Sequence, residues 1–103
     1  MNYADIQNKY INIELDKQNY KFSNAIDVKK ILGYDFRSMR GFKKLSDEHR
    51  ILAEGLICNY INGHGLEARE GIRPTNIKRE IGNFKVTFED KGYSYLFDNG
   101  SIG

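Results

Sequence analysis

The stretch "NFKVTFEDKGYSYLF", residues 83–97, carries an alternation of side chains that decides the fold class. In its first half, polar residues separate the apolar positions Phe84, Val86 and Phe88. After the polar turn "EDKG" (89–92), the alternation resumes at Tyr93, Tyr95 and Phe97. Two period-two runs joined by a short turn containing glycine predict an antiparallel β-hairpin.

A similar pattern near the N-terminus predicts another hairpin at residues 10–22, "YINIELDKQNYKF". Its apolar residues Ile11, Ile13 and Leu15 alternate with polar ones, "DKQN" is a polar turn, and Tyr20 and Phe22 share a face beyond it. Upstream, helical spacing predicts a short helix through Tyr3, Ile6 and Tyr10.

The middle of the chain is predicted to be helical. In "SNAIDVKKILG" (23–33), Ser23 or Asn24 caps the first turn and Gly33 ends the helix, with a buried stripe of Ala25, Val28, Ile31 and Leu32. A longer helix is expected at residues 46–62, capped by Ser46 and with an ion pair between Arg50 and Glu54. Its apolar positions are Leu52, Ala53, Leu56, Ile57, Tyr60 and Ile61.

The last part of the chain is less regular. Residues 66–73 predict one or two further helical turns, which Pro74 ends, and "DNGSIG" (98–103) is expected to be a frayed tail. Strands that flank a run of helices are typical of the α+β class. We therefore expect a single domain over residues 1–103, with an antiparallel sheet of about four strands, in two hairpins, packed on two or three helices.

Composition excludes several classes of protein. The chain is 40% hydrophobic and 13% aromatic, which argues against disorder. It has no apolar run near the roughly 20 residues of a membrane span, and its first residues do not resemble a signal peptide. Cys58 is the only cysteine, so an intrachain disulfide is impossible and a reducing cytoplasm is expected.

No residue pattern points to catalysis. His49 and His64 are the only histidines, and with Cys58 they do not form a metal-ligand cluster. Glu67 and Glu70 are three residues apart, but nearby arginines favour ordinary ion pairs. Motifs for phosphate-binding loops and serine hydrolases are missing from the sequence. We therefore expect a non-enzymatic protein with no metal and no cofactor.

Positive charge is concentrated in residues 29–44, which hold six basic residues and one acid. Within them, "YDFRSMRGFKK" (34–44) is predicted to connect two helices. Its aromatics either form part of the core, with Phe36, Met39 and Phe42 inside, or contact a partner; the core is favoured. The candidate partner-binding set is Arg37, Arg40, Lys43, Lys44 and Phe36, because arginine binds carboxylate or phosphate in a bidentate manner.

A second candidate group surrounds the glycine-rich stretch "NGHGLEAREGIRP" (62–74). Backbone amides and arginines can cradle a phosphate there, and tyrosines of the following hairpin can stack on a base. This second-choice anion- or nucleotide-binding set is Arg69, Arg73, Lys78, Arg79, Tyr93 and Tyr95. The competing interpretation is a turn-rich joint held by pairs of Arg and Glu.

The segment "NYINGHGLEAREGIRP" (59–74) resembles segments of small accessory proteins of bacteriophages and prophages. Its likeness is carried by Asn59, Asn62, Gly65, Leu66, Glu67, Arg69 and Pro74. The resemblance implies an anti-defence, anti-CRISPR-like protein that acts in the host cytoplasm by binding a host defence protein, such as a CRISPR nuclease, or its nucleic acid. Many anti-CRISPR proteins are acidic mimics of nucleic acid, whereas this chain has a net charge of +2.

Three other functions stay open at this stage. A protein that sequesters a nucleotide signal would use the second-choice set. A nucleic-acid-binding regulator would show strongly salt-dependent affinity. A virion assembly component would form a homo-oligomer through the exposed edges of its hairpins.

Overall fold

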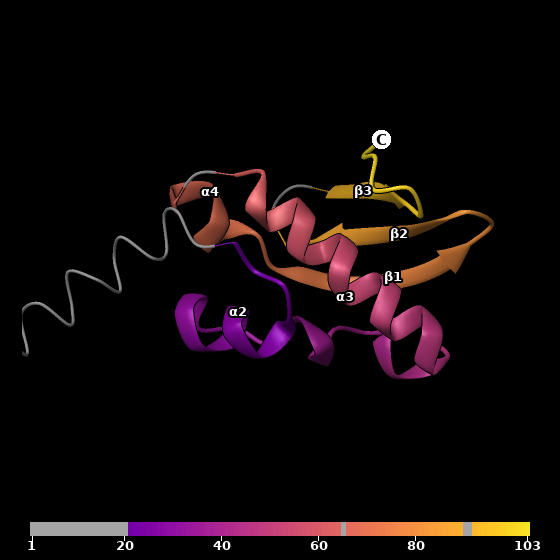
Figure 1. Cartoon of the computed structure of the whole chain (residues 1–103), viewed down its shortest axis with the longest axis horizontal. Coiled ribbons are helices and arrows are strands. Elements are labelled where there is room, and N and C mark those ends of the chain that lie inside the picture. Colours follow the sequence, from indigo (N-terminus) through magenta and orange to yellow (C-terminus); the bar gives the residue numbers. More distant parts are fainter. Residues whose placement is uncertain (1–20, 65, 90–91) are drawn as a thin grey trace, which may run out of the picture.

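The computed structural model describes residues 21–64, 66–89 and 92–103 (Figure 1). The predicted N-terminal helix and nearly all of the hairpin predicted at 10–22 lie outside these residues. Phe22, at the end of that hairpin, is described: it belongs to no strand, and its side chain is 3% exposed.

The described residues form an α+β fold with one antiparallel sheet, which confirms the predicted class. The sheet has three described strands in the order β1-β2-β3, not four, and its elements are β1 (Pro74–Glu80), β2 (Asn83–Phe88) and β3 (Gly92–Phe97). The predicted hairpin is β2 and β3. The first strand comes from residues 74–80, for which the sequence pattern predicted no strand.

The helical elements precede the sheet in the chain. They are α2 (Ala25–Leu32), the short 3₁₀ turns η1 (Phe36–Ser38) and η2 (Phe42–Lys44), α3 (Asp47–Asn62) and the short α4 (Leu66–Gly71). Asn24 caps α2 by accepting from the Asp27 amide at 2.9 Å, and Ser46 caps α3 through the His49 amide at 3.2 Å. Both predicted helices therefore begin where their capping residues indicated.

The core lies between α3 and one face of the sheet (Figure 1). The sheet supplies the buried side chains of Ile77, Phe84, Val86, Phe88 and Leu96, and α3 supplies those of Ala53, Leu56, Ile57, Cys58 and Ile61. The Tyr60 ring stacks on Phe88 with centroids 5.0 Å apart. Because each fully buried large apolar side chain contributes about 1.5–3 kcal/mol, this layer dominates the stability of the fold.

A half-buried carboxylate contact joins α2 and α3. Glu54 Oε1 accepts a hydrogen bond from the Ala25 amide at 2.8 Å, at the start of α2. The predicted ion pair between Arg50 and Glu54 is therefore wrong: Arg50 pairs instead with Asp47, three residues earlier. The free amide at a helix N-terminus attracts the carboxylate more effectively than an exposed side chain does.

The C-terminal residues are ordered, contrary to the predicted frayed tail. The chain turns back after β3, and Tyr95 and Gly103 exchange two backbone hydrogen bonds of 3.1 and 2.9 Å. Ile102 thereby forms a bridge with Leu96. The tail covers the outer edge of β3 with backbone pairing.

The connector, defined here as residues 34–46 between α2 and α3, is fixed to the other edge of the sheet. Arg40 donates to the Thr75 carbonyl at 3.0 Å and accepts from the Ile77 amide at 2.9 Å. Gly41 follows with a φ of 92°, and its Cα faces the Ile77 carbonyl so closely that a Cβ would overlap that oxygen. Only glycine fits this approach without strain.

We expect Gly41→Ala to lower the free energy of unfolding by about 3 kcal/mol, because left-handed strain of about 1–2 kcal/mol adds to the overlap with Ile77. Gly33→Ala is the matched control: its φ is 84°, but a Cβ there meets nothing within 4 Å. Gly33→Ala should therefore lower the free energy of unfolding only by the left-handed strain of about 1–2 kcal/mol. Urea unfolding followed by circular dichroism measures both, and equal losses would contradict the anchoring role of Gly41.

Candidate partner-binding site

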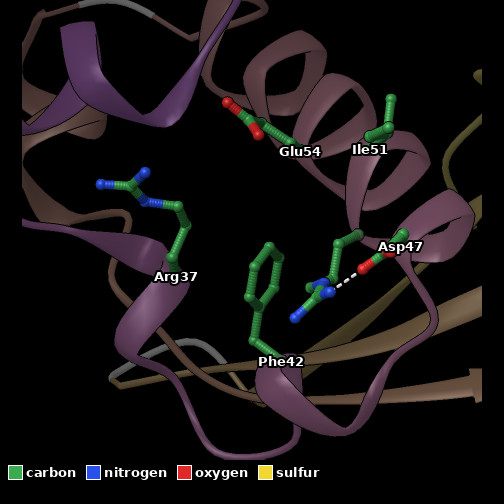
Figure 2. Close-up of a pocket in the computed structure, with 6 residues that line it drawn as sticks. Arg37, Phe42, Asp47, Ile51 and Glu54 are labelled. Atoms are coloured by element: carbon green, nitrogen blue, oxygen red, sulfur yellow. Dashed lines mark hydrogen bonds and ion pairs between the residues drawn. The ribbon is translucent and has the colours of Figure 1, made fainter.

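A groove opens between the connector and α3 (Figure 2). Its volume is about 430 Å³, and its lining residues are Arg37, Phe42, Asp47, Arg50, Ile51 and Glu54. Phe42 points from η2 into the hollow and forms its floor, while Ile51 and Glu54 project from α3 above it. Ile51 is 73% exposed, so its side chain is accessible to a partner.

The aromatics of the connector belong to the core, as the sequence favoured. Phe36 is 1% exposed, Met39 and Phe42 are buried beside it, and the rings of Phe36 and Phe42 meet edge to face at 6.5 Å. Phe36 was also placed in the candidate partner-binding set, and its burial means that this side chain is not available to a partner in the folded chain. Phe42 is buried among these residues and also lines the groove.

The basic residues of the connector divide into two kinds. Arg37 is held by Asp35, with two contacts of 3.0 Å between guanidinium and carboxylate. Arg40, Lys43 and Lys44 are exposed, and within the described ranges none of their side chains forms an ion pair. These three charges, unpaired within those ranges, lie on the connector but are not among the residues that line the groove. Their positive potential can attract an anionic surface.

The second-choice residues do not converge on one pocket. Arg69 is 3% exposed, and its guanidinium donates to the carbonyls of His64 and Asn62 at 2.7 and 3.1 Å. Arg73 lies over the Tyr34 ring at 5.6 Å, and Arg79 binds Asp98 in a bidentate pair at 2.6 and 2.8 Å. The remaining members, Lys78, Tyr93 and Tyr95, lie on the face of the sheet that points away from α3.

The groups considered for catalysis are engaged in packing. Cys58 is 1% exposed, and burial raises the pKa of its thiol to about 12, so it stays protonated at neutral pH. His49 packs edge to face on Phe84, and His64 Nδ1 donates to the Tyr60 carbonyl at 2.6 Å. No cluster of metal-binding side chains occurs in the described part of the chain.

Comparison of the chain with protein-family models, curated proteins and solved structures finds no match. None of the helices in the described residues is long and apolar enough to cross a membrane. The geometry of the described surfaces therefore carries the functional argument.

We expect Arg69→Lys to lower the free energy of unfolding by about 2 kcal/mol, because an ammonium cannot reach both buried carbonyls at once. Arg73→Lys is the control, since Arg73 is exposed and a lysine keeps the cation near Tyr34. It should change stability by less than about 0.5 kcal/mol. If Arg69→Lys changes stability as little as Arg73→Lys does, Arg69 does not stabilise the loop after α3.

The pair of Asp35 and Arg37 should make stability depend on pH. The side-chain hydrogen bond from Arg37 lowers the pKa of Asp35 in the folded state. The stabilisation is complete above the unfolded-state pKa of about 4 and is lost as pH falls through the lower folded-state pKa. Asp35→Asn should therefore cost about 0.5–1 kcal/mol at pH 7 and almost nothing near pH 2, as measured by urea unfolding. A deficit that persists at pH 2 would contradict this origin.

Proposed function

We propose that this chain is a non-enzymatic binding protein of the anti-CRISPR-like, anti-defence type, which inhibits a host defence system by covering a surface of one of its proteins. The observation that carries the proposal is the groove between the connector and α3, where Phe42 and Ile51 lie among charged residues of both signs, together with three exposed positive charges on the connector that are unpaired among the described residues. The proposed contact side chains are Ile51 in the groove and Arg40, Lys43 and Lys44 on the connector.

The physical argument combines an apolar anchor with nearby positive charge. Protein interfaces draw most of their affinity from a few apolar or aromatic anchors in pockets, and surrounding charges steer the encounter. Ile51 is exposed beside the Phe42 floor, so an apolar side chain of a partner can bury both surfaces. The positive charges of the connector then favour an acidic patch on that partner, or the phosphates of a nucleic acid bound to it.

The segment that carries the phage resemblance supports the site from a distance. The Asn62 side chain exchanges hydrogen bonds of 2.7 and 2.9 Å with the backbone of Phe22. Arg69 donates to the carbonyl of His64, in the loop that follows α3. Pro74 begins β1, on whose edge the connector rests. In this proposal the motif residues build the scaffold, and the connector and α3 make the contact.

The alternatives draw less support from the geometry. A nucleotide-sequestering pocket would need Arg69, Arg73 and the tyrosines together, and they lie apart. Assembly through open sheet edges is disfavoured, because Arg40 pairs with β1 and residues 101–103 pair with β3.

The test is an affinity purification from a bacterial host lysate, followed by an activity assay of the captured, identified protein. The variant Arg40→Glu/Lys43→Glu/Lys44→Glu should weaken binding at least about tenfold, because three connector charges are reversed. Ile51→Asp tests the groove separately. Lys29→Glu/Lys30→Glu is the matched control, since both lysines are exposed on α2, outside the connector.

Two results would support the proposal together: loss of the partner with either test variant, and inhibition of the partner's activity by the wild-type chain alone. Retained binding by both test variants would contradict the assigned surface. Capture of a protein whose activity is unchanged would contradict the inhibitor role. Thermal unfolding of every variant, compared with the wild type, separates a lost contact from a lost fold.

A further inference from the structure

The face of the sheet opposite α3, here called the outer face, carries aromatic side chains where polar ones would suffice. The register places Tyr93, Tyr95 and Phe97 of β3 opposite Thr87, Lys85 and Asn83 of β2. Those residues pair in turn with β1 at Asn76, Lys78 and Glu80. All nine therefore point away from the core residues Ile77, Phe84, Val86 and Leu96.

The aromatics of the outer face are accessible. Tyr93 is 55% and Phe97 is 37% exposed, and Tyr95 is half-buried between them. A sheet with one solvated face normally alternates apolar residues inward with polar residues outward. Three aromatics at every second position of one strand depart from that rule. The Phe97 ring lies against Gly103 of the C-terminal tail, but Tyr93 and Phe97 keep much of their surface in solvent.

Lysines lie beside these rings. Lys85 Nζ is 4.3 Å from the centroid of Tyr93, and the Tyr93 and Tyr95 rings meet edge to face at 5.5 Å. Lys78 pairs with Lys85 across β1 and β2, so the two cations and Tyr95 form one row. Among the nine outer-face residues Glu80 is the only acid, and its carboxylate accepts from Asn83 Nδ2 at 3.0 Å. The outer face is therefore positive as well as aromatic.

We propose that the outer face binds single-stranded nucleic acid, with unpaired bases stacked on Tyr93, Tyr95 and Phe97 and phosphates near Lys78 and Lys85. Other proteins bind single strands with aromatic side chains, on which every base can stack, and with cations that follow the phosphate backbone. Alternate residues of a strand are about 7 Å apart, which gives successive bases separate platforms.

The same observations disfavour other occupants. In a double helix the bases are stacked on one another, so their faces are not available to the rings. A protein partner would be expected to use a hollow that can accept an apolar anchor, such as the connector groove. The outer face instead interleaves rings with cations, and negative charge joined to flat aromatic groups is the chemistry of a nucleic acid strand.

Fluorescence anisotropy with labelled 12-mers of deoxythymidine and of uridine tests the proposal, and the two oligomers show whether DNA or RNA is preferred. A duplex of equal length is the third probe. Tyr93→Leu should lower affinity about tenfold, because leucine keeps the apolar volume and removes the stacking surface, whereas Tyr93→Phe should bind like the wild type. Lys78→Gln/Lys85→Gln should flatten the salt dependence, and Lys29→Gln/Lys30→Gln on α2 should not.

Four outcomes would overturn the proposal: no binding to either single strand at low salt, equal binding to the duplex, unchanged affinity of Tyr93→Leu, or an identical salt slope for the two double-lysine variants. If no strand binds but Tyr93→Leu abolishes capture of a protein, the face belongs to a protein contact. All variants replace exposed or half-buried side chains, and thermal unfolding verifies that each remains folded. The result is independent of the connector groove, whose variants lie elsewhere on the chain.

Discussion

Two backbone hydrogen bonds between Arg40 and β1 determine how the surface of this protein is arranged. They hold the middle of the connector against the edge of the sheet, at 3.0 and 2.9 Å from its partners. With the backbone fixed there, Phe36, Met39 and Phe42 turn into the core and the intervening basic residues turn outward. The close approach at Gly41 makes this arrangement possible, because a side chain would separate the connector from Ile77. The groove and its floor both depend on that contact.

Local signals in the sequence predicted the helices and the hairpin, because caps, periodicity and turns act over a few residues. Asn24, Gly33 and Ser46 each occupy the expected capping position. The strand β1 was missed for a physical reason: Pro74 begins it, Ile77 is its only other buried position, and its neighbours are polar. It is ordered by pairing with β2 and with Arg40. The C-terminal residues are ordered by backbone pairing with β3 and by the pair of Arg79 and Asp98, contacts that an alternation pattern does not reveal.

The candidate sites also depend on contacts that local sequence patterns do not reveal. The sequence correctly favoured burial of the connector aromatics. Phe36 was nevertheless also placed in the partner-binding set, and a buried ring cannot serve that role. Arg69 looked like an anion ligand because arginines are normally exposed, and only the folded loop shows that it bonds two carbonyls. On β3, the alternation of side chains indicated a strand, but it did not indicate which set of alternate residues faces the core. The register pairs Leu96 with Phe84, so the aromatic positions of β2 and β3 face opposite sides.

The two proposed surfaces meet along one edge of the sheet. The connector follows β1, and Arg40 bridges Asn76, which shares a row of the outer face with Thr87 and Tyr93. The groove opens on the side of α3, while the rings and lysines face the other way. A partner that presents an acidic patch beside a bound single strand can therefore contact both surfaces around β1. Once one contact forms, the second becomes intramolecular, so modest affinities at each surface combine into tight binding without a deep pocket at either.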